Sequence, residues 1–155
     1  NMWIAAGEPG KAALALDKAL AGTGLLADQR GLALLDRARA AEAQNDLKTA
    51  RAKTDEALKS ADEDPFAWYF SAALAARENN LKAAETAIAR ALTLAPNDSD
   101  ILFEAGHIAQ LGSDEARARG LWQRALAANP GGTGGQAAKK ALDLLAAPPS
   151  APAGR

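Results

Sequence analysis

The sequence is poor in the residues on which most catalytic sites depend. It contains no cysteine and a single histidine, His107, and only 5% of its residues are aromatic. The absence of cysteine excludes disulfides and thiolate metal sites, and a zinc site would have to take most of its ligands from carboxylates. No serine lies in a nucleophile motif that His107 could serve. We therefore expect no catalytic residues, no metal and no cofactor, and we expect that the protein is not an enzyme.

The sequence also lacks an excess of charge of either sign and any long apolar run. Its 155 residues include 18 basic and 19 acidic residues, for a net charge of −1. Nucleic-acid binding would need a basic patch, and a membrane span would need ~20 consecutive apolar residues, so we expect neither. The chain begins with Asn1 before Met2 and shows no signal-peptide pattern. We interpret it as a fragment or a mature form from a bacterial cytoplasm or periplasm.

Alanine makes up most of the hydrophobic content, which is 48% of the chain. Alanine is the best helix former and a poor strand former. Its segments are interspersed with lysine, arginine, glutamate and aspartate, and apolar residues recur three and four positions apart. The composition and the spacing together predict an all-α protein in which helices pack at short distance.

The helical pattern repeats every 34 residues. The segment RALTLAP at 90–96 returns as RALAANP at 124–130, and residues 31–64, 65–98 and 99–132 align without gaps. Residues 11–21 match the second half of a frame if about four extra residues are allowed near 24–28, which gives a partial repeat at 1–24. A fixed period of this length is typical of helical repeat arrays. The recurring alanines are expected to be buried at the helix contacts, namely Ala84, Ala91, Ala118 and Ala125.

Polar residues mark the middle of each frame, between its two predicted helices. Asparagine, aspartate and glycine tolerate left-handed backbone and cap helices. The pairs at these positions are Gly7-Glu8, Asn45-Asp46, Asn79-Asn80 and Ser113-Asp114.

Two further motifs have simpler structural interpretations. We interpret Asp62-Glu63-Asp64 as a solvated turn whose last acid caps a helix opening at Pro65, because the glycine and the distal glutamate of a calcium loop are missing. The segment at 22–27 formally matches a dinucleotide fingerprint, but a helical pattern precedes it rather than a strand, so we interpret it as a linker.

The repeat resembles the tetratricopeptide repeat (TPR) family. The family pattern is Trp, two residues, Leu-Gly, two residues, Tyr, then Ala, three residues, Phe, then Pro. The resemblance implies an all-α, right-handed superhelical solenoid of antiparallel helix pairs. The first full frame diverges from the pattern at Arg37 and Thr54, and Trp3 falls on the tyrosine position of the partial frame. The best-matching residues are Trp68, Ala72, Ala84 and Pro96 in one frame and Gly106, Ala118, Trp122 and Pro130 in the next.

The repeat stops at the glycine-rich segment GGTGG at 131–135. One more amphipathic helix is predicted after it, at 136–146, as the capping helix that a solenoid needs at its end. Prolines then prevent further helix, so residues 148–155 are predicted to be a flexible tail. We therefore expect a single domain over residues 1–147.

The resemblance also implies where a partner would bind, because in this family the first helix of each repeat lines a concave groove. There we predict an aromatic strip of Phe66, Tyr69, Phe70 and Phe103, although Phe70 fits a core position equally well. Charged residues, Glu104 among them, are expected to form its rim. The predicted partner-binding residues are Leu35, Arg39, Phe66, Tyr69, Arg77, Asp100, Phe103 and His107.

These features predict a non-enzymatic protein-interaction module that binds a peptide or a partner helix in its groove. One branch of the family binds chaperone C-termini through a clamp of Lys, Asn and Arg. Only Arg39 among the matching positions here is cationic, so we do not expect this kind of binding. An alternative is a structural or assembly domain, which would self-associate or dock on an upstream segment through an apolar edge near Met2, Trp3 and Ile4. A regulatory domain attached to an enzyme is a third hypothesis.

Overall fold

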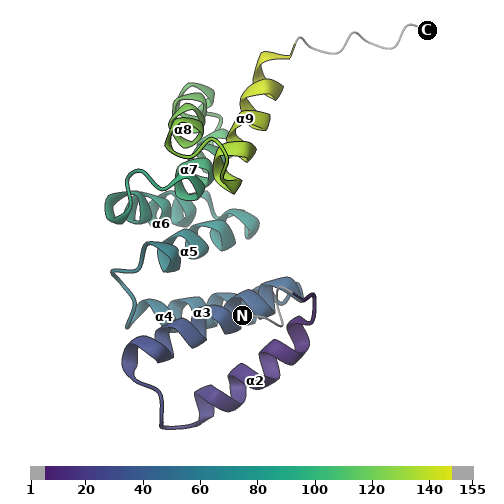
Figure 1. The fold of residues 1–155 in the computed structure, drawn as a ribbon, viewed down its shortest axis with the longest axis vertical. Coiled ribbons are helices and arrows are strands. Elements are labelled where there is room, and N and C mark those ends of the chain that lie inside the picture. Colours follow the sequence, from purple (N-terminus) through teal and green to yellow (C-terminus); the bar gives the residue numbers. More distant parts are fainter. Residues whose placement is uncertain (1–5, 148–155) are drawn as a thin grey trace, which may run out of the picture. The chain divides into compact units, whose positions relative to one another are not determined.

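The computed structural model describes residues 6–147, which are all-helical as predicted. The described chain forms two compact units, residues 6–95 and 96–147. The first unit contains α2 (Pro9–Ala21), α3 (Ala27–Ala43), α4 (Leu47–Leu58), α5 (Pro65–Arg77) and α6 (Leu81–Leu94). The second contains α7 (Ser99–Leu111), α8 (Glu115–Ala128) and α9 (Thr133–Ala146) (Figure 1).

The polar pairs between helices form the predicted turns. Asn45, Asn79 and Ser113 adopt φ values of 59°, 61° and 62°, in the left-handed region. The residue that follows each of them caps the next helix by accepting a backbone N–H, and these caps are Asp46 for α4, Asn80 for α6 and Asp114 for α8. Gly7 also has a positive φ, of 74°, at the start of α2. The same short turn therefore closes the α3–α4, α5–α6 and α7–α8 pairs, which explains why these polar positions recur with the repeat, whereas the side chain of Glu8, after Gly7, makes no capping hydrogen bond.

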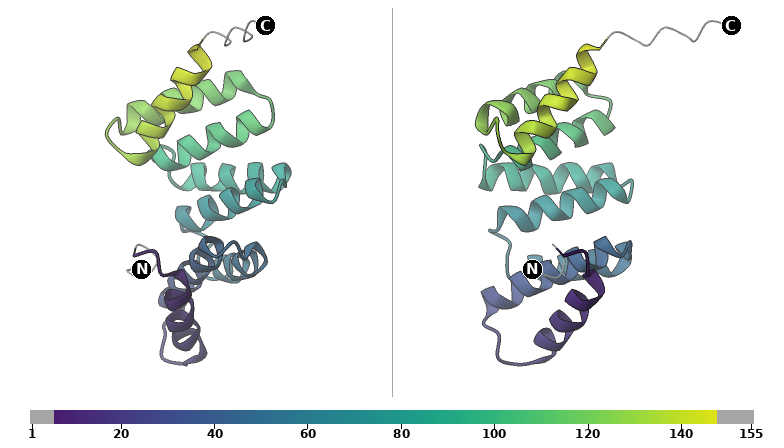
Figure 2. Two further views of the ribbon diagram at one scale, coloured as in Figure 1. Left: turned by 90° about the vertical axis from the view of Figure 1, so that its right-hand side faces the viewer. Right: turned by 45° about the vertical axis from the view of Figure 1, so that its right-hand side comes forward.

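In the first unit each helix packs against the next one along the chain, and α3 and α5 pair with α4 and α6 as antiparallel hairpins (Figure 2). Ala84 and Ala91 are completely buried, as predicted. The helix α3 has 17 residues, four more than α5. The four extra residues that the sequence alignment required near 24–28 thus lie largely in an additional helical turn at the start of α3.

The two residues that fit the repeat pattern poorly have their own polar partners. Arg37 donates from Nε to the Asp17 carboxylate on α2 at 2.7 Å, so a long basic side chain takes the place of a small packing residue. Thr54 is completely buried, and its hydroxyl donates to the carbonyl of Ala50 at 2.8 Å. Because its hydrogen bond is made within its own helix, Thr54 can occupy a position that holds isoleucine or tryptophan in the other repeats.

The second unit is built around a tryptophan. Trp122 on α8 is 2% exposed, and its indole Nε1 donates to the carbonyl of Phe103 on α7 at 3.1 Å. Ala118 and Ala125, on the same helix, are completely buried, as predicted. The helix α9 contacts both α7 and α8 and so covers the hairpin (Figure 2).

The capping helix begins earlier than predicted, at Thr133 instead of residue 136. Gly134 and Gly135 are buried inside its first turn. A Cβ on Gly134 would lie 2.5 Å from the carbonyl carbon of Ser99, and one on Gly135 would lie 2.8 Å from that of Asn129. The glycines therefore do not end the helical structure. They allow the start of α9 to approach the backbone of the preceding hairpin.

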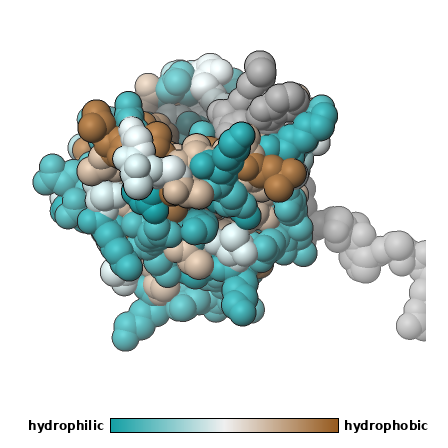
Figure 3. Space-filling view, turned by 90° about the horizontal axis from the view of Figure 1, so that it is seen from below, coloured by the Kyte–Doolittle hydropathy of each residue, from teal (hydrophilic) through white to brown (hydrophobic). Residues whose placement is uncertain are grey.

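Trp3, which falls on the tyrosine position of the partial repeat, and the predicted tail at 148–155 lie outside the described residues. On α2 itself Leu14 is 74% exposed, whereas Leu16 packs against a small cluster formed by Ala12, Ala13 and Ala40. In the space-filling view of Figure 3, hydrophobic residues form small separate groups among hydrophilic ones. None of the helices within residues 6–147 combines the length and the apolar character that a membrane span requires.

Candidate functional site

The first unit has a solvent-accessible hollow of about 530 Å³ between α3 and α5, which we call the α3–α5 hollow. On α3 its lining residues are spaced at i, i+3, i+4 and i+7, which places them on one face of the helix. On α5 they are spaced at i, i+3 and i+4. The lining consists of Leu32, Leu35, Asp36 and Arg39 from α3 and of Asp64, Phe66, Tyr69 and Phe70 from α5 and its cap.

Most of the wall of the α3–α5 hollow is apolar, and part of it faces solvent. Leu32 and Phe66 are 61% and 55% exposed, and Tyr69 is half-buried. Leu35 is buried at the base, where it belongs to a core cluster with Leu34, Ala57 and Ala67. Phe70 lines the hollow and also packs against the Ala41, Ala50 and Leu74 cluster, so it serves both the core and the hollow.

Hydrogen bonds fix the start of α5, which presents Phe66 to the hollow. The Asp64 carboxylate accepts the backbone N–H of Phe66 at 2.9 Å, and this confirms the predicted cap. One turn further on, the indole of Trp68 donates to the carbonyl of Asp62 at 2.7 Å. The turn before α5 is thus held from both sides by contacts that do not use the side chains of Asp62 or Glu63.

The polar end of the α3–α5 hollow has one cationic lining residue. The Arg39 side chain is 58% exposed, and its guanidinium lies 3.9 Å from the Asp36 carboxylate. Arg77, which was predicted to share the site, does not line the hollow. It is ion-paired with Glu42 and lies 3.3 Å from the Asn45 side chain, so it ties the end of α5 to the end of α3.

A second hollow, of about 440 Å³, adjoins the first, and we call it the acidic hollow. It shares Leu32 and Asp64 with the α3–α5 hollow. Its lining includes four carboxylates and no cation. The lining residues are Asp28, Leu32, Ser60, Ala61, Asp62, Glu63 and Asp64.

The remaining predicted site residues lie on α7 in the second unit. Asp100 and Phe103 are half-buried, and the Phe103 ring stacks on Trp122 with a centroid separation of 6.4 Å. The Glu104 side chain is only 11% exposed, so it is not the rim residue that was predicted. Its carboxylate lies 3.4 Å from Nδ1 of His107. The hydrogen bond to Glu104, aided by the charge of the same carboxylate, raises the pKa of His107 against the opposing effect of burial.

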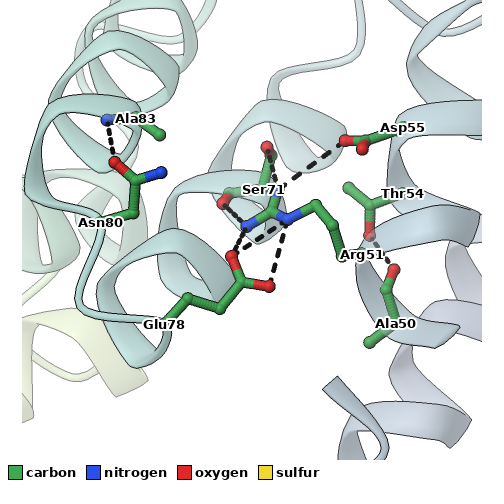
Figure 4. A network of polar contacts seen from close by, with 8 residues as sticks. All are labelled: Ala50, Arg51, Thr54, Asp55, Ser71, Glu78, Asn80 and Ala83. Carbon is green, nitrogen blue, oxygen red and sulfur yellow. Dashed lines mark hydrogen bonds and ion pairs between the residues drawn. The ribbon is translucent and has the colours of Figure 1, made fainter. Parts of the chain in front are cut away.

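A polar network that sequence reasoning missed joins α4 to α5 (Figure 4). Arg51 donates to the Glu78 carboxylate at 2.7 Å, to the Ser71 hydroxyl at 3.1 Å and to the Ser71 carbonyl at 3.3 Å. Asp55 lies 3.8 Å from the same guanidinium. The repeat pattern did not predict this network, because Arg51 occupies what looks in the sequence like an ordinary surface position of α4. All the donors of Arg51 point at groups of the protein itself, so we assign this network to stability.

No group of side chains within residues 6–147 has the composition and spacing of a metal site. The described helices form packed antiparallel pairs, and this arrangement defines a TPR-like fold.

Comparison with known proteins gives the same fold. No family model and no curated protein sequence matches the chain. Among solved structures, YrrB, a TPR protein described as having an unusual peptide-binding site, superposes with a TM-score of 0.73 at 19% identity, over 90% of this chain and 70% of that one. The first TPR domain of Spaghetti (RPAP3), bound to the HSP90 peptide SRMEEVD, superposes with a TM-score of 0.70 at 16% identity, over 81% of this chain and 96% of that one. The TPR domain of Arabidopsis OM64 superposes with a TM-score of 0.69 at 16% identity, over 77% of this chain and 99% of that one.

Proposed function

We propose that the protein is a non-enzymatic protein-interaction module that binds a peptide or a partner helix, and that the α3–α5 hollow is its main binding site. One observation carries this proposal: two large apolar side chains, Leu32 and Phe66, are more than half exposed in the same hollow. Isolated exposed leucines are ordinary on protein surfaces, but apolar residues that meet in a concavity of ligand-binding size are typical of recognition sites. The peptide-bound RPAP3 structure and the peptide-binding site of YrrB support the same class of function.

The mechanism is burial of one or two partner side chains against these residues. Removing a leucine or phenylalanine side chain from water contributes about 1.5–3 kcal/mol. Tyr69 and Phe66 are rigid aromatic rings, which lose little conformational freedom when a partner covers them. Arg39, at the polar end of the hollow, would orient the partner by pairing with an acceptor on it.

We also propose that Asp100, Phe103 and His107 take part in partner binding, because they occupy the equivalent positions of the next 34-residue repeat. The side chain of His107 is 44% exposed. Arg77 would act indirectly, since its ion pair with Glu42 holds the ends of the two helices that form the α3–α5 hollow.

Selection of peptides from a random display library on the intact chain tests the proposal. We expect enrichment of short peptides with one or two large apolar residues, and we expect Phe66→Ala and Leu32→Ala to weaken their binding about tenfold or more. The matched control is Leu144→Ala, which removes a leucine that is 77% exposed on α9. Failure to enrich any peptide, or equal losses in the control and the hollow variants, would contradict the proposal.

A further inference from the structure

The acidic hollow lies directly beside the proposed binding site, and its charge indicates which partner fits. The two hollows share Leu32 and Asp64, so a segment seated in one reaches the other without a break. Among the lining residues of both hollows together, Asp28, Asp36, Asp62, Glu63 and Asp64 are acidic and Arg39 is the only cation. An occupant of this surface therefore meets an excess of negative charge.

Most of the five acids of this surface have no ion pair with another described residue. None of the ion pairs among the described residues involves Asp28, Asp62 or Glu63. The nearby Arg30 is engaged elsewhere, because its guanidinium donates to the carbonyl of Leu20 at 2.9 Å and lies 3.6 Å from Glu56. Asp62 and Glu63 are exposed on the turn. Their carboxylates are thus available to an incoming cation.

From this charge distribution we infer that the partner is a basic–apolar peptide segment, and this inference rests on the proposed function. A leucine-like or aromatic side chain occupies the α3–α5 hollow, and a lysine or arginine close to it in sequence lies over the acidic hollow. An extended chain advances ~3.3 Å per residue, and the hollows are contiguous, so the cation is expected within about three residues of the apolar anchor. The charge adds specificity and speeds association, and acidic segments are disfavoured.

A display library with one fixed leucine and randomised flanks tests the charge preference on the intact chain. The expected result is enrichment of lysine and arginine on one side of the leucine and depletion of glutamate and aspartate. Enrichment of peptides with neutral or acidic flanks would overturn the inference while leaving the proposed function standing. Enrichment of no peptide at all would contradict the proposed function itself.

Two synthetic peptides of about seven residues then locate the effect. They carry the same leucines and differ only in having two lysines or two glutamates. In fluorescence-polarisation titrations at low salt, the lysine peptide is expected to bind about tenfold or more tightly than the glutamate peptide, and the difference should shrink as salt screens the charges. Equal affinities, or tighter binding of the glutamate peptide, would overturn the inference.

Substitution of the turn acids completes the test. Asp62→Asn with Glu63→Gln is expected to reduce the preference to less than about threefold. The fold should be unaffected, because the turn is held by the Asp62 carbonyl and by the Asp64 cap rather than by these two side chains. The matched control is Glu85→Gln with Asp143→Asn, which removes two exposed acids outside both hollows. A preference that survives the first pair of substitutions, or is lost equally in the control, would overturn the inference.

Discussion

Gly106 and Trp122 are in contact so close that no side chain fits between them: a Cβ added to Gly106 would lie 2.5 Å from Cδ1 of the indole. The same indole donates its N–H to the carbonyl of Phe103, one turn earlier on α7. The glycine at this repeat position therefore sets the distance between α7 and α8 and allows the tryptophan to reach its acceptor.

Gly106→Ala is expected to destabilise the second unit by about 1–3 kcal/mol, because the indole would have to shift and weaken its hydrogen bond. Gly120→Ala is the matched control. Gly120 lies on the exposed side of α8, and a Cβ there meets nothing within 4 Å. Alanine should stabilise the helix at that position by about 0.5–1 kcal/mol. Chemical denaturation of the two variants should thus give shifts of opposite sign.

Ala91 tests the packing of the first unit. Because its side chain is completely buried, Ala91→Leu is expected to overpack the helix contact and to cost about 1–3 kcal/mol. Ala89→Leu, two residues earlier on the exposed side of α6, should change the free energy of unfolding by less than about 0.5 kcal/mol. Thermal melts that are alike for the two variants would show that the buried face of α6 has been assigned wrongly.

Arg51 should contribute more to stability than an arginine on an ordinary surface pair. Its side chain is 25% exposed and that of Glu78 is 28% exposed, so Arg51→Met is expected to cost about 1–2 kcal/mol. Arg119 occupies the equivalent position two repeats later, where it pairs with Glu115 on a more exposed surface. Arg119→Met should cost less than about 0.5 kcal/mol. A double-mutant cycle with Glu78→Gln measures the coupling directly, and a coupling near zero would contradict the assignment.

His107 should make the stability of the second unit depend on pH. The hydrogen bond to Glu104 raises the pKa of His107 above its ordinary value of 6.5, so the protonated form stabilises the folded state. This contribution is fully present below about pH 6.5 and is lost as the pH rises through the raised pKa. Urea denaturation between about pH 5.5 and 8.5 should show the loss in the wild type and not in His107→Gln. In Glu104→Gln, an NMR titration should find a lower His107 pKa.

Tyr69 and Phe103 occupy equivalent positions in consecutive repeats, but we expect Phe103 to contribute mainly to stability and Tyr69 mainly to peptide binding. Phe103 stacks on Trp122, so Phe103→Ala is expected to lower the free energy of unfolding by about 2–4 kcal/mol. Tyr69 is half-buried beside a solvent-accessible hollow, so Tyr69→Ala should weaken peptide binding by about 1–3 kcal/mol with a smaller loss of stability. Parallel melts and binding titrations separate the two effects. Equal destabilisation by the two variants would contradict this division.

The repeat made the helices and their turns predictable, because residues such as Asn45 and Asp46 act locally through backbone conformation and capping. Spacing also placed Leu35 with Arg39, and Phe66 with Tyr69, on one face of each helix, and the resemblance to the TPR family implied that these two faces line one groove. The sequence did not predict that Glu104 is buried, that Arg51 crosses from α4 to α5 or that acids gather beside Leu32. Those features depend on which side chains meet across helices, and a one-dimensional pattern does not contain that information.

The close backbone contact at the start of α9 limits how this array of repeats could be lengthened. The contact requires glycine at both Gly134 and Gly135, so it is a steric fit of main chain to main chain rather than a polar cover over an apolar surface. In an engineered array, a standard hairpin appended after Pro130 would meet this same surface with side chains. It would need the wider spacing of an ordinary repeat, and α9 would have to be removed rather than followed.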